Sequence, residues 1–481
     1  MPALTSLGIG SGVDLNTMLT QLVALERKPL EQMKAEASKL QTKVSSFGQV
    51  QSLVSRVQDA ANKLKGTSLW SQSVAKSSNE AVVTAVGGSS AAAGTYSISV
   101  TSLASAQTLI SGAPYPDASG LVGAGTLTLE QGSWSAGQAA FTAKTGTSAV
   151  TLDITAEDTV ATLRDKINSL GAGVSASLVN DANGTRLALR STATGAANGF
   201  RIGVADDDGD LADSAGLSRI GFDPPGGITG MGLSKGAADA VASVNGIAVT
   251  STSNELVGVV DGLTLRLRAE SATAVDVDVS PDRAAITEAI TGLASAYSDL
   301  AKTIGEQTKY DASSKVGGPL QGDSAVGGVL ARLRSVINNS SGASTAFARL
   351  SDIGLELQRN GTLSVDSGKL DKSLGNLDEL KKAFAHADPL VVGNDGFARR
   401  FATLSTDLLA VDGSLTTRTE GLRKLITQNS EKQTRLEDRV GRYQDRLTQQ
   451  FTAMDSNLAR LNALNSYVTQ QLAALTSSSS K

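Results

Sequence analysis

Apolar residues follow a coiled-coil rhythm near the start of the chain. Between Leu30 and Leu64 they recur three and four residues apart, with one additional three-residue step between Phe47 and Val50. This spacing predicts an amphipathic helix with a seam for a partner helix, locally overwound at the additional step. Asp14 precedes the first apolar face and predicts the helix N-cap. Gly66 predicts its end.

The same rhythm returns at the other end of the chain. Helical character begins near Asp395, and beyond Gly421 roughly 54 residues keep the spacing, with a four-residue stutter between Leu447 and Phe451. At 1.5 Å per residue such a helix is about 80 Å long. Polar residues stand at or beside several seam positions, which favours partial exposure: Asn429, Gln433, Asn465 and Gln471.

The middle of the chain alternates apolar and polar residues with period two. From about Ser77 to Pro281, β-branched runs between glycine-rich turns predict half-buried strands. Within this region Val160 to Leu170 is expected to be a helix, and Asn183-Gly184 a hairpin turn. The stretch from Val244 to Leu267 is expected to form a strand, a turn, a short helix and a strand.

These patterns predict an α+β, multi-domain chain in which terminal α-helical coiled-coil legs enclose two nested β-rich head domains. We expect residues 1–45 with 435–481 to form a terminal coiled-coil segment. A helical leg domain with a small β-hairpin at Asn360-Gly361 is expected at 46–77 with 281–434. An outer head domain is expected at 78–113 with 237–280, and an inserted head domain at 114–236.

Both ends carry narrow apolar stripes that no contiguous compact body covers. Each stripe must therefore pack on the other end or on another molecule, because exposing it costs about 25 cal/mol per Å² of apolar area. We expect the terminal segment to be disordered in the monomer and to become ordered on assembly. The alternative is a helical hairpin closed within one chain.

Composition and charge remove most kinds of chemistry. The chain has no cysteine and a single histidine, His386, which lies between a helix end and a proline turn and reads as a surface residue. The net charge of −4 argues against a nucleic-acid-binding protein, which normally carries a clustered basic surface. The acidic run at 205–210 lacks the spacing of a calcium loop and reads as a solvated turn. No catalytic, metal or cofactor site is predicted, and the chain is expected to be no enzyme.

The sequence shows neither the features of a secretory signal peptide nor those of a membrane-spanning helix. The N-terminus lacks the basic region and apolar core of a secretory signal peptide, and no 18-residue apolar run occurs. We therefore expect no membrane insertion, and export, if any, by a route that uses no cleaved signal.

Several stretches resemble one family. The segment "GIGSGVDLNTMLTQLVALERKPL" is similar to the N-terminal signature of the flagellar filament cap family, flagellar hook-associated protein 2. Val244–Leu267, "DIGLELQRNGTLSVDSGKL" and Phe451–Leu472 resemble other parts of that family. The unit around "DTVATLRDKIN" resembles one shared with flagellins and other hook-associated proteins.

The resemblance implies an extracellular, homo-oligomeric ring at the flagellum tip that assists folding and insertion of exported flagellin and prevents its loss. It also implies junction proteins as partners, an export chaperone on the C-terminal helix, and type III export. Residues expected to dock on flagellin or junction coils are Val13, Leu15, Met18, Leu19, Leu22, Leu25, Met454, Leu458, Leu461, Leu464, Val468 and Leu472. Residues expected to pair within the leg are Leu40, Val44, Phe47, Val54, Val57, Leu64, Leu404, Leu408, Leu436, Val440 and Leu447.

Two other functions stay open at this point. A hook–filament junction protein or filament subunit shares terminal coils, although the Gly8–Leu30 signature argues against it. A glycan-binding adhesin would need exposed aromatic residues, and only Trp70 and Trp134 are tryptophans.

Overall fold

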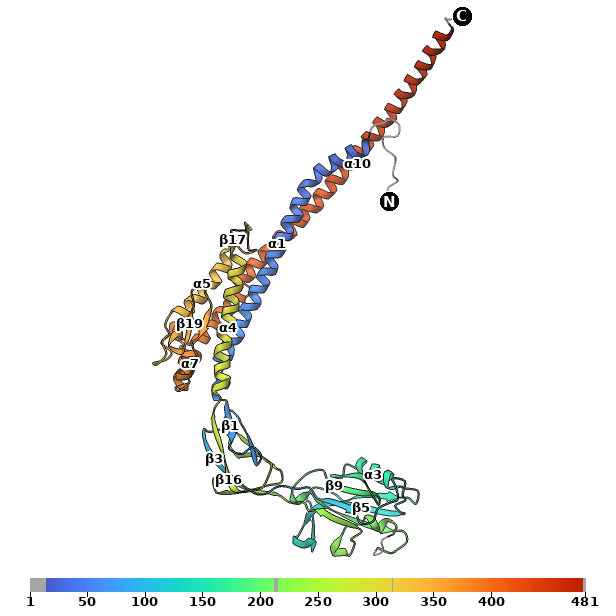
Figure 1. Cartoon of the computed structure of the whole chain (residues 1–481), viewed down its shortest axis with the longest axis vertical. Coiled ribbons are helices and arrows are strands. Elements are labelled where there is room, and N and C mark those ends of the chain that lie inside the picture. Colours follow the sequence, from blue (N-terminus) through green and yellow to red (C-terminus); the bar gives the residue numbers. More distant parts are fainter. Residues whose placement is uncertain (1–13, 212–214, 314, 479–481) are drawn as a thin grey trace. The chain divides into compact units, whose positions relative to one another are not determined.

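The computed structural model describes residues 14–211, 215–313 and 315–478. The chain divides into a helical unit, residues 1–67 with 284–481, and a β-rich unit, residues 68–283 (Figure 1). The predicted α+β fold class, with terminal helices enclosing β-rich material, is confirmed. The boundaries at 67/68 and 283/284 differ from those expected at 77/78 and 280/281, because β1 (Ser73–Ser77) joins a sheet of the β-rich unit.

The first helix of the helical unit is α1 (Leu15–Lys65). The Asp14 carboxylate caps it by accepting a hydrogen bond from the backbone N–H of Thr17, 3.0 Å away. The helix ends where the Gly66 N–H donates to Asn62. Pro29 lies inside α1, where it removes one hydrogen bond of the helix.

The C-terminal helical region consists of two helices. These are α9 (Phe397–Leu409) and α10 (Ser414–Ser478), separated by a turn in which the Gly413 N–H donates to Ala410. A Cβ at Gly413 would come within 2.6 Å of the Asp407 carbonyl oxygen, so the turn requires glycine. The single helical region expected from Asp395 is therefore broken here.

The remaining helices of this unit are α4 (Arg283–Thr308), α5 (Ser324–Asn338), α6 (Leu350–Ile353), α7 (Ser367–Ser373), α8 (Leu377–Ala385) and the short turn η5 (Val392–Asn394). Of these, α4, α5 and α8 pack against α1 or α9, and α6 packs on α7 and the small hairpin. The expected hairpin at Asn360-Gly361 is formed by β19 (Leu355–Leu357) and β20 (Leu363–Val365), and β17 (Tyr310–Asp311) pairs with β18 (Val316–Gly317). Tyr297, Phe384, Phe397 and Phe401 are fully buried in the unit. The short helix α2 (Thr67–Ser71) follows α1.

The outer lobe of the β-rich unit contains two antiparallel sheets. One has the order β1-β16-β3-β12-β13, and the other β14-β15-β2. The new strands are β2 (Val83–Gly87), β3 (Gly94–Ser102), β12 (Ala240–Val244), β13 (Ile247–Ser251), β14 (Glu255–Val260), β15 (Leu263–Leu267) and β16 (Ser271–Pro281). Their apolar side chains form a separate core that includes Ile98, Leu265 and Val277.

One expectation for the outer lobe is wrong. The short helix expected within Val244–Leu267 is the strand β14, which pairs with β15. Leu256 of β14 is buried and Val257 is exposed, and the valines of this strand are β-branched residues that favour extended backbone. A bulge after Val257, where Gly258 has a φ of +74°, interrupts the alternation that a strand would otherwise show in sequence.

The inner lobe has a second core between two antiparallel sheets. Their orders are β10-β5-β6, with β7 also paired to β5, and β11-β4-β9-β8. The elements are β4 (Thr108–Ser111), β5 (Gly125–Trp134), η1 (Ala136–Gln138), β6 (Phe141–Ala143), β7 (Val150–Ile154), α3 (Val160–Ser169), β8 (Val174–Asp181), β9 (Gly184–Ser191), η2 (Ala196–Asn198), β10 (Gly199–Asp206), η3 (Leu217–Ile220), η4 (Pro224–Gly226) and β11 (Met231–Lys235). The hairpin expected at Asn183-Gly184 joins β8 to β9. Because β4 lies between β11 and β9, the inserted lobe begins before the boundary expected at 113/114.

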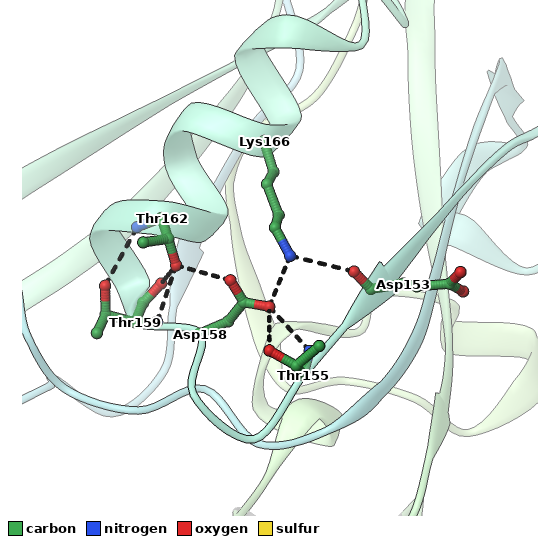
Figure 2. Close-up of polar contacts among 6 residues, drawn as sticks. All are labelled: Asp153, Thr155, Asp158, Thr159, Thr162 and Lys166. Atoms are coloured by element: carbon green, nitrogen blue, oxygen red, sulfur yellow. Dashed lines mark hydrogen bonds and ion pairs between the residues drawn. The ribbon is translucent and has the colours of Figure 1, made fainter.

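A buried carboxylate holds α3 onto the inner lobe. Asp158, directly before the N-cap residue Thr159, accepts hydrogen bonds from the Thr155 N–H at 2.8 Å and the Thr162 hydroxyl at 2.9 Å (Figure 2). The Lys166 ammonium lies 2.6 Å from the same carboxylate and also donates to the Asp153 carbonyl. Burial opposes ionisation, yet the hydrogen bonds from Lys166, Thr155 and Thr162 outweigh it and hold the pKa of Asp158 well below its usual value.

Candidate assembly interface

The first half of α1 packs against α10 through a small apolar cluster. Val23 and Leu30 of α1 and Leu436 and Val440 of α10 are buried together, and Leu19 and Met33 lie against them half-buried. Val23 and Leu30 are seven residues apart, so they occupy the same position of successive heptads. Few side chains therefore hold the first half of α1 against α10.

Two ion pairs show which way α10 runs along α1. The Lys34 ammonium lies 3.6 Å from Glu437, and the Arg439 guanidinium lies 3.1 Å from Glu26. Closer to the start of α1, Thr20 and Gln444 line one small cavity. Lower numbers on α1 therefore face higher numbers on α10, and the two helices are antiparallel (Figure 1).

The far end of α10 extends past the described start of α1. Extrapolating the antiparallel register from Thr20 and Gln444, Leu15 lies opposite residue ~449 of α10. No residue from 441 to 474 is buried, so burial along α10 ends at Val440. The seam nevertheless continues beyond Val440 as exposed apolar residues: Met454, Leu461, Leu464, Val468 and Leu472, with Leu458 half-buried.

The start of α1 carries two adjacent apolar stripes with different surroundings. Leu15 is buried, and Leu19 packs against the α1–α10 cluster. Met18, Leu22 and Leu25 form the second stripe, with exposed fractions of 46%, 37% and 60%. The expected docking residues of α1 thus divide into an enclosed pair and an open stripe, and Val13 lies outside the described residues.

The residues expected to pair within the leg are mostly enclosed. Phe47, Val54, Val57 and Leu64 of α1 are fully buried, as are Leu408 of α9 and Leu436 and Val440 of α10 to within a few per cent. The others are half-buried: Leu40, Val44, Leu404 and Leu447. The enclosed part of α1 also bonds to its neighbours through side chains, since Ser46 donates to Gln307 at 3.0 Å and Gln58 to Thr406 at 2.7 Å.

Sequence reasoning missed two residues of this region. Val23 is buried in the coil, and its signal was available because it stands seven residues before Leu30. Tyr467 is 61% exposed beside Val468 on the free part of α10, and a strict three–four count passes over it. Both follow from a stripe that is wider than a two-position seam.

Side chains suited to catalysis or metal binding are not brought together in the part of the chain that the structure describes. No group of histidine and acidic side chains there is placed to hold a metal ion. His386 caps the end of α8 and is exposed, as expected. The run at 205–210 forms a turn in which the Asp208 carboxylate accepts from the Asp210 N–H and the Asp206 carboxylate from the Ser218 N–H. None of the described helices is both long and apolar enough to cross a lipid bilayer.

Comparison with known proteins gives matches over almost the whole chain. Residues 11–107 match the sequence profile described as flagellar hook-associated protein 2 N-terminus, and residues 237–463 match that of its C-terminus. Residues 140–193 match the flagellin hook IN motif. The profiles therefore cover α1, the outer lobe, part of the inner lobe and most of the C-terminal helical region, and all three come from flagellar proteins.

Individual relatives agree with the profiles. The flagellar hook-associated protein 2 of Escherichia coli K12 is 30% identical over 98% of both chains. The B-type flagellar hook-associated protein 2 of Pseudomonas aeruginosa is 30% identical over 99% of both chains. The crystal structure of the D1-D2-D3 domains of the flagellar cap protein FliD from Escherichia coli superposes with a TM-score of 0.59 at 28% identity, covering 79% of this chain and 99% of that one. The chain therefore belongs to the flagellar hook-associated protein 2 family, whose members are structural flagellar proteins and not enzymes.

Proposed function

We propose that this protein forms a homo-oligomeric ring at the tip of the flagellar filament, where it assists folding and insertion of exported flagellin and prevents its loss. The observation that carries the proposal is the exposed apolar seam of α10, which continues from Met454 to Val468 beyond the buried cluster that ends at Val440. An apolar seam of this kind gains free energy only by packing on another helix. The coils of flagellin or of hook–filament junction proteins are the partners that we propose.

The geometry favours docking that is weak and reversible. The open stripe of Met18, Leu22 and Leu25 is short, and the free seam of α10 is one helix wide. A short stripe and a single helix face offer few apolar contacts, and lower affinity appears mainly as faster dissociation, so we infer that docking is short-lived. A cap that shifts as each flagellin subunit is added needs such contacts, whereas a large permanent core would hold it in place.

The same exposed seam supports a role for an export chaperone. An apolar helix surface left open before assembly promotes association with unintended partners. We propose that a cytoplasmic chaperone covers Leu461 to Leu472 before the protein leaves through the flagellar type III channel, without a cleaved signal peptide. The mature protein is then extracellular.

A gene deletion tests the cap function directly. The deletion strain is expected to carry hooks without filaments and to release monomeric flagellin into the medium, both restored by added purified protein. In the same strain, Leu461→Asp is expected to fail in complementation while the β-rich unit stays folded. Gln470→Asp, which adds the same charge to the same helix away from the seam, is the matched control. Normal filaments in the deletion strain would overturn the cap function, and full complementation by Leu461→Asp would overturn the docking face.

The alternative functions receive less support. A filament subunit would itself polymerise. Deletion of a junction protein would leave a missing segment in the flagellum, which added purified protein would not restore. For a glycan-binding adhesin, Trp134 is the relevant aromatic residue in the inner lobe. Its indole N–H donates to Gln107 at 3.1 Å and its ring packs on Phe141 and Phe222, so it is engaged in the lobe itself.

A further inference from the structure

The helical unit contains a cationic pocket where α8 and the start of α9 meet the end of α1. Its volume is about 450 Å³, and its lining includes Lys65, Lys381, Lys382, His386 and Arg399. The acidic residue in the lining is Asp378. Three lysines and one arginine therefore share the lining with one carboxylate, in a protein whose net charge is −4.

Part of this charge has a structural explanation. Lys65 lies in the last turn of α1 and Lys382 in the last turn of α8, where cations favour the negative end of the helix dipole. Lys382 also pairs with Glu379 at 2.8 Å, and Glu379 in turn accepts from the Ser344 hydroxyl and the Thr345 N–H. These two lysines would be present without any ligand.

Arg399 has no such explanation. It lies in the first turn of α9, where a cation opposes the helix dipole, and the cap residue Gly396 has no side chain to offer. Its Nε is buried and has no hydrogen-bond partner within the described structure. A buried N–H donor without an acceptor costs about 1–3 kcal/mol. The described fold supplies no acceptor to this Nε, and an anion in the pocket would offset the unfavourable positive charge that Arg399 places at the helix start.

We propose that this pocket binds carboxylate side chains of an acidic segment from a protein partner. Carboxylates are the acceptors that the arginine fork recognises in two-point geometry, and Lys381, which is exposed and forms no ion pair in the described structure, adds a second cation. The pocket volume falls in the range of sites for small ligands, far above the space that one inorganic anion fills. The pocket is separate from the terminal seams, so the inference does not depend on the proposed function.

The single histidine of the chain reports on this pocket. In the full-length protein, the ring proton resonances of His386 are to be followed by NMR during titration with hexaglutamate, at constant ionic strength. We expect a saturable movement of these resonances. Inorganic phosphate is expected to bind at least tenfold more weakly, and hexalysine to leave the resonances in place.

Variants locate the response. Arg399→Gln and Lys381→Gln are each expected to weaken hexaglutamate binding at least fivefold, while Lys424→Gln on α10, which removes one exposed positive charge elsewhere, leaves it unchanged. Circular dichroism checks that each variant is folded, and a variant that unfolds is replaced by Arg399→Lys, for which the same weakening is expected because the fork is lost. The proposal is overturned if hexaglutamate does not saturate, if phosphate binds as tightly, or if the Lys424 variant weakens binding as much as the pocket variants.

Discussion

The carboxylate of Glu26 on α1 lies 3.1 Å from the guanidinium of Arg439 on α10. Directly beside this pair, Val23 and Leu30 bury Leu436 and Val440 in the cluster that closes the intramolecular coil. Further along α10 the seam is still apolar but exposed. The helix α10 thus carries one apolar seam that is buried against α1 and a second one whose side chains are exposed.

Substitution of Val440 in the buried seam should weaken the α1–α10 coil, whereas substitution of Val468 in the exposed seam should affect filament growth alone. Val440→Asp places a charge at a site that is 3% exposed, so we expect the local opening of the α1–α10 coil to become easier by about 3 kcal/mol. Hydrogen exchange of α1 amides between Leu19 and Met33 measures this opening.

The matched change on the free seam should behave in the opposite way. Val468 is 45% exposed, so Val468→Asp should alter the free energy of coil opening by less than about 0.5 kcal/mol. Filament growth in the deletion strain should nevertheless fail with this variant. If Val468→Asp supports growth as well as the unmodified protein, the free seam has no docking role.

The Glu26–Arg439 pair should contribute little to stability. Its side chains are 40% and 62% exposed, so solvent screening should limit the coupling energy to about 0.2–1 kcal/mol. A double-mutant cycle with Glu26→Gln and Arg439→Gln measures this coupling, which should vanish in 1 M salt. A coupling above ~2 kcal/mol would show that the pair, and not the apolar cluster, holds the coil together.

The buried polar residue Asn429 should specify register at a cost in stability. It is 8% exposed on α10, and its carboxamide oxygen accepts from Gln433 at 2.6 Å. We expect Asn429→Leu to raise the thermal midpoint of the helical unit and to permit additional coil pairings, because a polar seam residue restricts the allowed register. Calorimetry measures the midpoint, and cross-linking of α1 to α10 measures the register. A lower midpoint would contradict this role.

Asp158 should make the stability of the inner lobe depend on acid. The pKa of Asp158 is lower in the folded state than its usual value of 3.8, chiefly because hydrogen bonds from Lys166 and Thr155 outweigh burial. Its contribution is therefore complete above about pH 4 and is lost as the pH falls further, toward the folded value. We expect Asp158→Asn to cost about 1–3 kcal/mol at neutral pH and to remove this acid dependence.

Fluorescence of Trp134, in a Trp70→Phe background, follows unfolding of the inner lobe in denaturant at each pH. Asp165→Asn is the control, since Asp165 is 66% exposed and lies on the same helix. An equal loss of stability in both variants would mean that the buried cluster has no special role.

Much of the architecture could be predicted because it rests on local periodicity. The seam of α1, its cap at Asp14, its end at Gly66 and the hairpin at Asn183-Gly184 each depend on residues within a few positions of one another. The exception among strands, β14, was misassigned because a bulge at Gly258 breaks the period of two. The placement of β4 in the inner lobe depends on pairing with the distant β9 and β11, which no local pattern encodes.

The sequence by itself determined that both ends are amphipathic helices in need of a partner, because side-chain spacing alone sets which residues share a helix face. Only the tertiary structure decided which partner each stripe finds. The antiparallel register of α1 and α10 buries Val23 and Val440 but leaves Leu461 and Val468 open, because α10 is longer than its described partner. Likewise, only the tertiary structure places Arg399, Lys65 and Lys381 around one pocket. They come from three helices that are distant in sequence, so no local pattern indicates a shared site.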